Sequence, residues 1–229
     1  MVERVTPIVT IDGPSGSGKG TISRILAQRL GWRLLDSGAL YRLTALGGAQ
    51  ANLAADDEAG HAAFALKMQV EFGADAAGGE RISLNGVDVT AAVRAETTGQ
   101  GASRVAAWPA VRSALLQRQQ RFATTPGLVA DGRDMGTVIF PAANLKVFLT
   151  ASAEERARRR YNQLKDKESA VSLAALSREI AERDLRDSTR SVAPLKPASD
   201  AHVIDSTGLA ASEVVDRVWR LGQISGLWF

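Results

Sequence analysis

Short apolar runs alternate with segments of helical periodicity along most of the chain. The run at 7–11 is rich in β-branched residues and ends at Asp12 and Gly13, which predicts a buried strand followed by a glycine-rich turn. Apolar residues then recur at helical spacing over 21–30, and Gly31 supplies the helix stop. This alternation predicts an α/β fold, with a parallel sheet covered by helices on both faces. Further strands are expected at 33–35, 128–130, 145–149 and 201–204, and further helices at 38–54, 56–68, 106–124, 153–167, 172–187 and 212–221.

The pattern changes between residues 57 and 98. The segments 70–72 and 81–84 alternate between apolar and polar residues, as half-exposed strands do. Asn85-Gly86 follows the second of these segments directly, and this dipeptide is a strong signal for a tight hairpin turn. We therefore expect a small antiparallel β unit inserted into the α/β core.

The composition of the 229 residues is typical of a soluble globular protein, with 45% apolar and 23% charged residues. No stretch approaches about 18 consecutive apolar residues and no signal-peptide pattern precedes the first strand, so we expect a cytoplasmic protein. The chain contains no cysteine, which excludes disulfides, thiolate metal sites and a cysteine nucleophile. The net charge of +3 is too small to indicate nucleic-acid binding. Arginine accounts for 22 of the 28 basic residues, which reflects either genome composition or the bidentate binding of phosphate by arginine.

A glycine-rich segment joins the first predicted strand to the first predicted helix. Glycines let successive backbone N–H groups turn toward an anion, and the N-terminus of the following helix favours phosphate at the same place. Lys19 is placed to reach the β- and γ-phosphates of a nucleotide. A connecting turn without ligand is disfavoured because the strand before and the helix after both agree with a phosphate-binding loop. The loop comprises Gly13, Pro14, Ser15, Gly16, Ser17, Gly18, Lys19, Gly20 and Thr21.

The end of this loop departs from the common pattern, in which Ser or Thr follows the lysine directly. Here Gly20 intervenes and the hydroxyl group is on Thr21. The Gly-Lys-Gly-Thr ending resembles nucleoside monophosphate kinases more than GTPases or motor ATPases. We therefore do not assign Thr21 as a direct Mg²⁺ ligand, and a contact to phosphate oxygens is the alternative.

The segment 35–42 ends the second predicted strand and opens a helix. Ser37 is suited to cap that helix. Arg42 lies near the same strand ends as the phosphate-binding loop and is suited to contact the phosphate of an acceptor. On local evidence alone, a surface arginine is an equally good interpretation of Arg42.

The segment 129–137 follows another apolar strand and is rich in charge. Asp131 lies at the end of that strand, where it suits either a Mg²⁺-bound water or a structural hydrogen bond. Arg133 and Asp134 lie beyond the strand, where open α/β sheets bind ligands. A solvated turn is the alternative for this segment.

Two predicted helices between 153 and 187 are rich in arginine. Ser152 and Glu155 indicate a capping box at the start of the first helix. Arginines three or four positions apart share a helix face, as do those at 156 and 159/160 and those at 183, 186 and 190, so two such helices joined near 165–168 would form a lid over a nucleotide. A solvated charged surface is the alternative, because acidic residues are interspersed. The eight arginines between 156 and 190 are at positions 156, 158, 159, 160, 178, 183, 186 and 190.

Together these segments resemble the bacterial cytidylate kinases over almost the whole chain. The motifs that carry the resemblance are GPSGSGKGT at 13–21, LLDSGALYR at 34–42, ASRVAAWPAVRSALLQRQ at 102–119, VADGRDMGT at 129–137, ERDLRDSTRSVAPL at 182–195 and VIDSTGL at 203–209. The resemblance implies transfer of the γ-phosphoryl group of ATP to CMP or dCMP, with Mg²⁺ entering mainly with ATP. It also implies a five-stranded parallel core at about 1–56, 99–150 and 191–229, an acceptor-binding insert at about 57–98 and a mobile lid at about 152–190.

The resemblance further implies roles for individual side chains. The glycine-rich loop and Arg158 would hold the ATP phosphates, and the catalytic residues would be Lys19, Arg133 and Arg190. The acceptor would be bound by Arg42 and Arg133 at its phosphate, by Ser37, Ser103, Arg112 and Asp134 at the cytosine, by Arg183 and Asp187 at the sugar, and by Arg190 at the substrate phosphates. Asp36, Asp131 and Thr21 are the candidates for water-mediated contact with Mg²⁺.

Two other classes of function stay open from the residues alone. One is a kinase for a different monophosphate, and the other is a P-loop switch or nucleic-acid-binding protein that uses the arginine-rich helices. A GTPase switch needs Gly-Lys-Ser/Thr and an Asn-Lys-x-Asp guanine motif, and neither occurs in the chain. Nucleic-acid binding is typical of larger net charges or interleaved aromatic residues. We therefore expect a monomer that uses CMP and dCMP and has no nucleic-acid or membrane partner.

Overall fold

The computed structural model describes residues 6–75, 79–164 and 172–228. The chain forms two compact units, the first made of the segments up to Asp36 and from Gln120 onward, and the second of Ser37–Gln119. Within the described residues, no helix is both long enough and apolar enough to cross a membrane. The segment 165–168, which was expected to join the two arginine-rich helices, lies outside the described residues.

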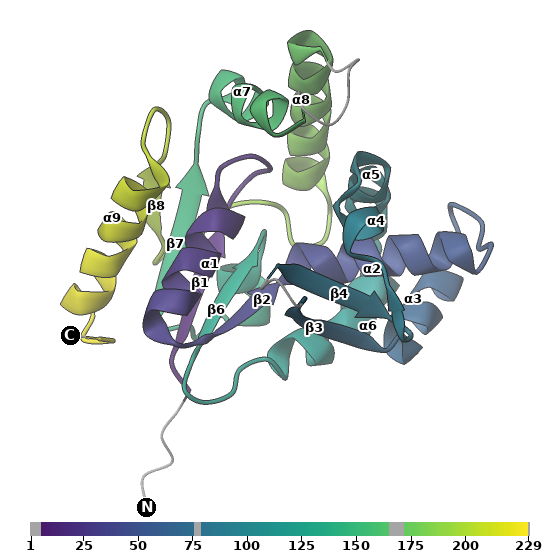
Figure 1. Ribbon diagram of the computed structural model, residues 1–229, viewed down its shortest axis with the longest axis horizontal. Coiled ribbons are helices and arrows are strands. Elements are labelled where there is room, and N and C mark those ends of the chain that lie inside the picture. Colours follow the sequence, from purple (N-terminus) through teal and green to yellow (C-terminus); the bar gives the residue numbers. More distant parts are fainter. Residues whose placement is uncertain (1–5, 76–78, 165–171, 229) are drawn as a thin grey trace, which may run out of the picture. The chain divides into compact units, whose positions relative to one another are not determined.

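A five-stranded sheet forms the centre of the first unit, in the order β2-β6-β1-β7-β8 (Figure 1). Each neighbouring pair is parallel, so the predicted parallel sheet is confirmed. The strands are β1 (Ile8–Asp12), β2 (Arg33–Asp36), β6 (Leu128–Gly132), β7 (Leu145–Thr150) and β8 (His202–Asp205). The flanking helices are α1 (Lys19–Leu30), α7 (Ala153–Leu164), α8 (Leu173–Thr189) and α9 (Ala211–Ile224).

The apolar core of the first unit lies around β1. Val9 and Ile11 of this strand are fully buried, and Leu26 of α1 and Val218 of α9 belong to the same core cluster. A central parallel strand is buried on both faces, which explains why 7–11 is rich in β-branched residues and does not alternate with charged ones.

The carboxyl ends of the neighbouring strands β1, β2 and β6 carry acidic residues. Asp12 ends β1 and Asp36 ends β2, while Asp131 of β6 pairs in register with Asp36. Parallel strands end at the same edge of their sheet, and this is the edge at which open α/β sheets bind ligands. The fold therefore places these carboxylates beside the segments that follow the strands.

The second unit combines helices with a three-stranded antiparallel sheet, β3-β4-β5. Asn85 and Gly86 both have positive φ, 51° and 83°, and Leu84 pairs with Val87 across them. Two consecutive positive φ values match a type I′ turn, so the predicted hairpin is confirmed. The strands are β3 (Val70–Ala74), β4 (Glu80–Leu84) and β5 (Val87–Asp88), and the helices are α2 (Ser37–Gln50), α3 (Glu58–Lys67), α4 (Thr90–Arg94), α5 (Glu96–Val105) and α6 (Pro109–Gln120).

The prediction of a single helix over 106–124 is wrong at both ends. Helix α5 already ends at Val105, and α6 begins at Pro109 and stops at Gln120. Proline has no N–H to donate and disfavours helical conformation in the residue before it, Trp108. The chain therefore cannot continue from α5 into α6 as one helix, and Pro109 becomes the first residue of a new one.

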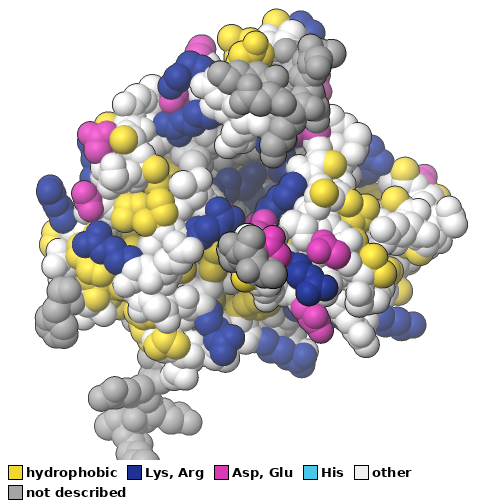
Figure 2. All heavy atoms as spheres, in the orientation of Figure 1, with side chains coloured by type: hydrophobic (Ala, Val, Ile, Leu, Met, Phe, Trp, Pro, Cys, Tyr) yellow, Lys and Arg dark blue, Asp and Glu magenta, His cyan; other side chains and the backbone are white. Residues whose placement is uncertain are grey.

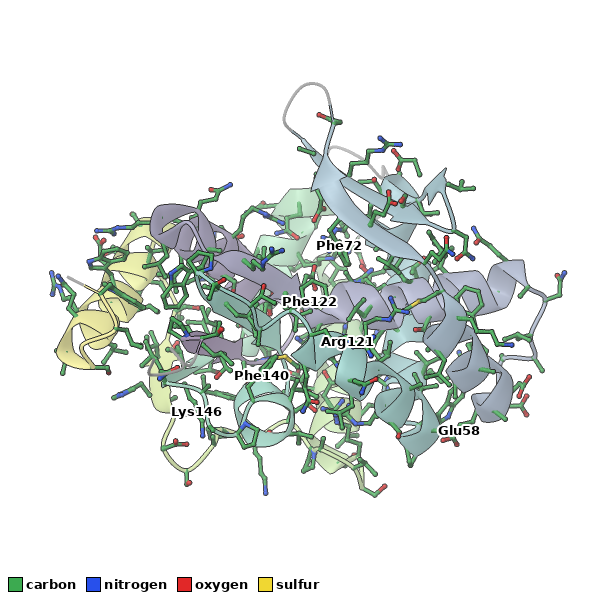
Figure 3. The ribbon with its side chains drawn as sticks, turned by 90° about the horizontal axis from the view of Figure 1, so that it is seen from below. Glu58, Phe72, Arg121, Phe122, Phe140 and Lys146 are labelled. Atoms are coloured by element: carbon green, nitrogen blue, oxygen red, sulfur yellow. The ribbon has the colours of Figure 1, made fainter. Side chains whose placement is uncertain are left out.

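Glu58, the first residue of α3, joins this helix to the start of α6 (Figure 3). Its carboxylate accepts a hydrogen bond from the backbone N–H of Ala110 at 2.8 Å. The first N–H groups of a helix have no partner inside the helix, so this contact satisfies one of them. His61 of α3 also packs edge-on against Trp108, with 5.3 Å between the ring centroids, so the two segments are joined at two points.

The C-terminal end of the chain is docked on the first unit. Trp228 is buried, and its indole Nε1 donates a hydrogen bond to the carbonyl oxygen of Trp219 at 3.1 Å. Its ring meets Trp32 edge-on, with 5.8 Å between the ring centroids. A Cβ atom at Gly222 would come within 1.8 Å of the Trp228 indole. The docked indole therefore requires glycine at position 222.

Replacing Gly222 by Ala should expel the Trp228 indole from this place. We expect the free energy of unfolding to fall by about 3 kcal/mol, as in Trp228→Ala, because both changes remove the same buried ring contacts. The double variant should lose little more than either single variant, since both act on one contact. Denaturant unfolding measures these losses, with Gly73→Ala as control because a Cβ there would meet no atom within 4 Å. Additive losses in the double variant would contradict the docking.

Candidate functional site

The glycine-rich loop 13–21 joins β1 to α1. Gly16 has a φ of 77° and Gly18, the N-cap of α1, has a φ of 91°, both in the left-handed region that favours glycine. In this fully described segment no side chain caps α1 and no acidic residue lies in its first turn. The positive end of the helix dipole is therefore not offset by an acid of its own helix, which favours an anion at the loop. Lys19 folds back over the loop, and its Nζ donates to the Pro14 carbonyl oxygen at 3.0 Å.

Lys19 is surrounded by charged side chains of the first unit. Burial lowers the pKa of the Lys19 ammonium to about 7, and the guanidinium groups of Arg133 and Arg183 add to this shift. The carboxylates of Asp36 and Asp131 act in the opposite direction. The loop thus lies where positive charge is concentrated and where a phosphate would stabilise the charged form of Lys19.

Two of the carboxylates are suited to a metal ion that arrives with phosphate. Asp36 and Asp131 are in register on adjacent strands, and Asp131 Oδ2 lies 3.2 Å from where a Cβ of Gly20 would be. Mg²⁺ prefers oxygen ligands, retains waters, and is commonly bound by one or two carboxylates plus substrate phosphates. Among the described residues no group of three or more His, Cys, Asp or Glu side chains could hold a metal alone. This pair of carboxylates therefore fits water-mediated contact with a phosphate-bound cation. Thr21, the third candidate for such contact, is exposed in the first turn of α1.

Two arginines of α7 bind the carbonyl oxygens of the loop. Nη1 of Arg156 donates to the Ser15 carbonyl at 3.1 Å, and Nη1 of Arg159 donates to the Ser17 carbonyl at 3.3 Å. The carbonyl and N–H of a trans peptide point in opposite directions, so these contacts turn the next N–H groups away from α7. The loop packs closely here, since a Cβ at Gly16 would lie 3.0 Å from the Cβ of Arg156. Helix α7 therefore helps to fix the conformation of the loop.

Arg156 also joins α7 to α8, and these two helices lie side by side beyond the end of β7 (Figure 1). Its two Nη atoms donate to the carboxylate of Asp184 on α8 at 3.0 and 2.6 Å, and its Nε donates to the Ala151 carbonyl at 3.0 Å. The Arg156 side chain is only 7% exposed, so this ion pair is largely shielded from water. One buried guanidinium thus connects the loop, the end of β7 and α8.

The neighbouring arginines of α7 differ in what they contact. Arg158, which was predicted to bind ATP, is bound to the Glu155 carboxylate at 2.8 Å and its side chain is 60% exposed. The arginines that contact the loop are Arg156 and Arg159, which were predicted to share one helix face but were not among the predicted ATP-binding residues. Their spacing indicated that these two arginines share a face of the helix, but not that this face meets the loop.

Only half of the predicted capping box of α7 is present. Ser152 Oγ accepts a hydrogen bond from the Glu155 N–H at 3.2 Å, as expected. The Glu155 carboxylate does not return to Ser152, whose own N–H donates to Thr207 Oγ1. The Glu155 carboxylate instead forms ion pairs with Arg158 and Arg159, which lie one helical turn away, and these ion pairs replace the expected contact with the Ser152 N–H.

The predicted residues Arg133, Arg183, Asp187 and Arg190 form one cluster. Nε of Arg133 donates to Oδ2 of Asp187 at 3.1 Å. Burial alone would raise the pKa of the Asp187 carboxyl, but the three guanidinium groups outweigh burial and the pKa is lowered. Asp187 is therefore ionised and acts as a shared counter-ion for three arginines that were expected to contact the acceptor.

Asp12 was not among the predicted site residues. Its two carboxylate oxygens accept hydrogen bonds from the backbone N–H groups of Met135 and Gly136, both at 2.8 Å. These residues open a short π-helix, Met135–Ile139, whose N-cap is the buried Asp134. Burial raises the pKa of Asp12 to about 7 against the effect of these two N–H donors. Asp12 thus fixes the backbone just after Arg133 and Asp134, and an aspartate at a strand end gives no sequence signal for this contact.

Two predicted acceptor residues lie on α2, in the second unit. Ser37 is the first residue of α2 and is buried. Arg42 is partly buried, and its Nη1 donates to the carbonyl oxygens of Val93 and Ala95. The structure thus directs Arg42 toward the α4–α5 junction and not into solvent.

Two further predicted residues, Ser103 and Arg112, are also buried in the second unit. The hydroxyl of Ser103 has no hydrogen-bond partner among the described residues, and a buried polar group without a partner is unfavourable. Arg112 donates to the Ala106 carbonyl at 3.3 Å, and its Cζ lies 5.9 Å from the centroid of the Tyr41 ring. Buried hydroxyl and guanidinium donors of this kind suit a polar ligand such as a nucleotide base.

Comparison with known proteins identifies close relatives over nearly the full length. The cytidylate kinase family model matches residues 9–223. A cytidylate kinase of Shewanella loihica is 57% identical over 210 residues, which cover 92% of this chain and 91% of the relative. A cytidylate kinase of Stutzerimonas stutzeri is 59% identical over 213 residues, covering 93% of each chain. A cytidylate kinase of Pseudomonas aeruginosa is 58% identical over 215 residues, covering 93% of this chain and 94% of the relative.

Asp184→Asn should loosen the loop by removing the charge that pairs with Arg156. We expect the free energy of unfolding to fall by about 2 kcal/mol, because a shielded guanidinium is left without its counter-ion. ATP binding should weaken by about tenfold, since the loop loses part of its fixed geometry. Denaturant unfolding and calorimetric titration with ATP measure the two effects, with exposed Arg178→Gln on α8 as control. Unchanged ATP affinity in Asp184→Asn would contradict a role of α7 in holding the loop.

Lys19 should take up a proton when a phosphate binds. Its pKa is about 7 in the free protein, so it is mostly neutral at a pH of about 8.5. Negative phosphates favour the charged form, so ATP binding at that pH should take up close to one proton, and affinity should fall as the pH rises above about 7. Calorimetric titration in buffers of different ionisation enthalpy measures this uptake. Lys19→Arg stays charged throughout and should take up none; equal uptake by the variant would contradict the assignment.

Proposed function

The chain belongs to the cytidylate kinase family, and on that premise we propose that the site described above carries out the family's reaction. The protein is a phosphotransferase that uses ATP to convert CMP and dCMP to CDP and dCDP. The observation that carries the assignment of the site is the charge around Lys19. Burial and the guanidinium groups of Arg133 and Arg183 destabilise the charged form of Lys19, which a bound anion would stabilise. Lys19 also lies at the start of a helix, where phosphate is favoured.

The proposed mechanism is direct transfer of the γ-phosphoryl group to the acceptor phosphate. That acceptor is already a competent nucleophile, so the protein needs to position the two phosphates and stabilise the charge on the transferred group. Lys19, Arg133 and Arg190 supply positive charge for this purpose. Mg²⁺ bound with ATP would neutralise charge on the β- and γ-phosphates, and Asp36 and Asp131 would hold its waters.

The acceptor is assigned to the residues that the resemblance implied for it. The unpartnered hydroxyl of Ser103 supports a contact to the cytosine, as does the buried guanidinium of Arg112; Ser37 and Asp134 complete that set. Arg183 and Asp187 are assigned to the sugar. Arg133 is bound to Asp187 in the structure, so an acceptor phosphate at Arg133 would replace that carboxylate as its counter-ion.

The proposal includes a division of the chain by role. The parallel sheet would hold ATP, the insert at about 57–98 would bind the acceptor, and the segment at about 152–190 would close as a lid that excludes water during transfer. The contacts of Arg156 and Arg159 of α7 with the loop, and of Arg133 with Asp187 of α8, support this role for the lid. We also propose that the enzyme works as a monomer in the cytoplasm.

A nucleic-acid-binding function is the less favoured alternative. On the face drawn in Figure 2, Lys and Arg side chains occur in several separate places and are interspersed with acidic ones. Affinity for a nucleic-acid backbone needs many phosphate contacts along one surface. The arrangement of the charges therefore favours contacts to the few phosphates of nucleotides.

A coupled assay of ATP consumption with CMP, dCMP, UMP, AMP and GMP tests the substrate assignment. We expect CMP and dCMP to be used best, and Lys19→Ala to lower turnover with CMP by on the order of 10³-fold while the protein stays folded. Arg112→Ala should raise the KM for CMP far more than the KM for ATP, because the arginine is assigned to the acceptor alone. Equal rates with UMP, or no turnover with CMP, would overturn the proposed substrates.

A further inference from the structure

Arg42 is held at the junction of two short helices. Its Nη1 donates to the Val93 carbonyl oxygen at 2.9 Å and to the Ala95 carbonyl oxygen at 3.0 Å. Helix α4 ends at Arg94 and α5 begins at Glu96, so the Val93 carbonyl belongs to the end of α4, while the Ala95 carbonyl lies between the two helices and also accepts a hydrogen bond from the Gly99 N–H at 3.1 Å. The last carbonyls of a helix lack partners inside it and carry partial negative charge, which a guanidinium group satisfies well.

Gly99 makes room for this guanidinium group. A Cβ atom at position 99 would lie 2.8 Å from Nη2 of Arg42 and 3.2 Å from its Cζ. Gly99 lies inside α5 and is not among the glycines with positive φ, so the backbone there accepts any residue, and alanine is the better helix former. The glycine is therefore explained by the guanidinium packed against it and not by the conformation of α5.

The antiparallel sheet fixes where the two carbonyls lie. Arg94, the last residue of α4, donates to both carboxylate oxygens of Glu80 on β4, at 3.0 and 2.6 Å. Thr90, the first residue of α4, accepts a hydrogen bond from the Ile82 N–H through Oγ1 at 2.8 Å. Helix α4 is thus attached to β4 at both of its ends.

We propose that the Val93 and Ala95 carbonyls and Gly99, together the Arg42 support, hold the Arg42 guanidinium in place for the acceptor phosphate. Gly99 is then a positioning residue for the acceptor substrate. The inference rests on the proposed function, in which Arg42 contacts that phosphate. An arginine oriented before its ligand arrives loses less conformational freedom on binding, which strengthens the complex. The antiparallel sheet would then contribute to acceptor binding, because it holds the helix α4 that orients Arg42.

Gly99→Ala tests this proposal directly. The added methyl group displaces the flexible end of Arg42, so the fold is retained while the KM for CMP rises by about tenfold and the KM for ATP is unchanged. Steady-state kinetics with each substrate varied in turn, together with thermal unfolding, measure both effects. Gly101→Ala is the matched control, because a Cβ there would meet the Cβ of Ala45 at 3.1 Å and does not reach Arg42. An unchanged or lowered KM for CMP in Gly99→Ala would overturn the proposal.

Variants of Arg42 distinguish a failure of this inference from a failure of the assignment of Arg42 to the acceptor phosphate. If Arg42→Ala raises the KM for CMP and Gly99→Ala does not, the Arg42 support is refuted and the acceptor assignment stands. If Arg42→Ala leaves the KM for CMP unchanged, the assignment of Arg42 to the acceptor fails, and the inference fails with it. The double variant should match Arg42→Ala alone, because Gly99 acts through Arg42. A further rise in KM in the double variant would show that Gly99 acts by another route.

The link to the antiparallel sheet has its own test. Glu80→Gln weakens the attachment of α4 without touching Arg42, and we expect the KM for CMP to rise by about threefold with an unchanged KM for ATP. Arg81→Gln removes an exposed ion pair to Asp88 on the same sheet and serves as the control. An unchanged KM for CMP in Glu80→Gln would show that the attachment of α4 to the sheet does not orient Arg42.

Discussion

The phosphate-binding loop is held in shape by donors that bind its carbonyl oxygens. Arg156 donates to the carbonyl oxygen of Ser15. Arg159 and the hydroxyl of Ser206 both donate to the carbonyl oxygen of Ser17. A backbone carbonyl removed from water needs such a partner, and each of the three donors lies at least 141 positions along the chain from the carbonyl that it binds. The glycines permit the loop conformation, but helix α7 and the turn after β8 select it. This is why the loop depends on the completed sheet and not on its own sequence alone.

The same region is balanced electrostatically by a small number of carboxylates. Asp187 is the counter-ion of three arginines, and Asp36 and Asp131 partly offset the arginines that lower the pKa of Lys19. Without these acids the concentrated positive charge would weaken the folded state by self-repulsion. Nucleotide phosphates bring negative charge to the same place, so the cluster that is stabilised by acids in the free protein can be stabilised by substrate in the complex.

Much of the fold could be predicted because its signals are local. The apolar runs bounded by glycine and aspartate, the Asn85-Gly86 turn and the stop at Gly31 each act through a few neighbouring residues. What could not be predicted depends on residues that are distant in the sequence and close in space. Nothing near Asp12 indicates that it binds the backbone at Met135 and Gly136. The choice among adjacent arginines of α7 depends on the rotation of the helix against the loop, which no local pattern specifies.

Glycine illustrates how one residue type serves two physical purposes that the sequence cannot separate. Gly18 is needed for its backbone, because φ is positive at the start of α1. Gly99 has ordinary helical conformation and is needed for space, because a guanidinium group lies against it. The first kind can be anticipated from a loop motif, whereas the second appears only when another element, here α2, is packed in place. Glycine in the middle of a helix lowers the stability of that helix, so its presence points to a neighbour that occupies the space of the missing side chain. In this protein the neighbour of Gly99 is Arg42, which is predicted to bind the acceptor substrate.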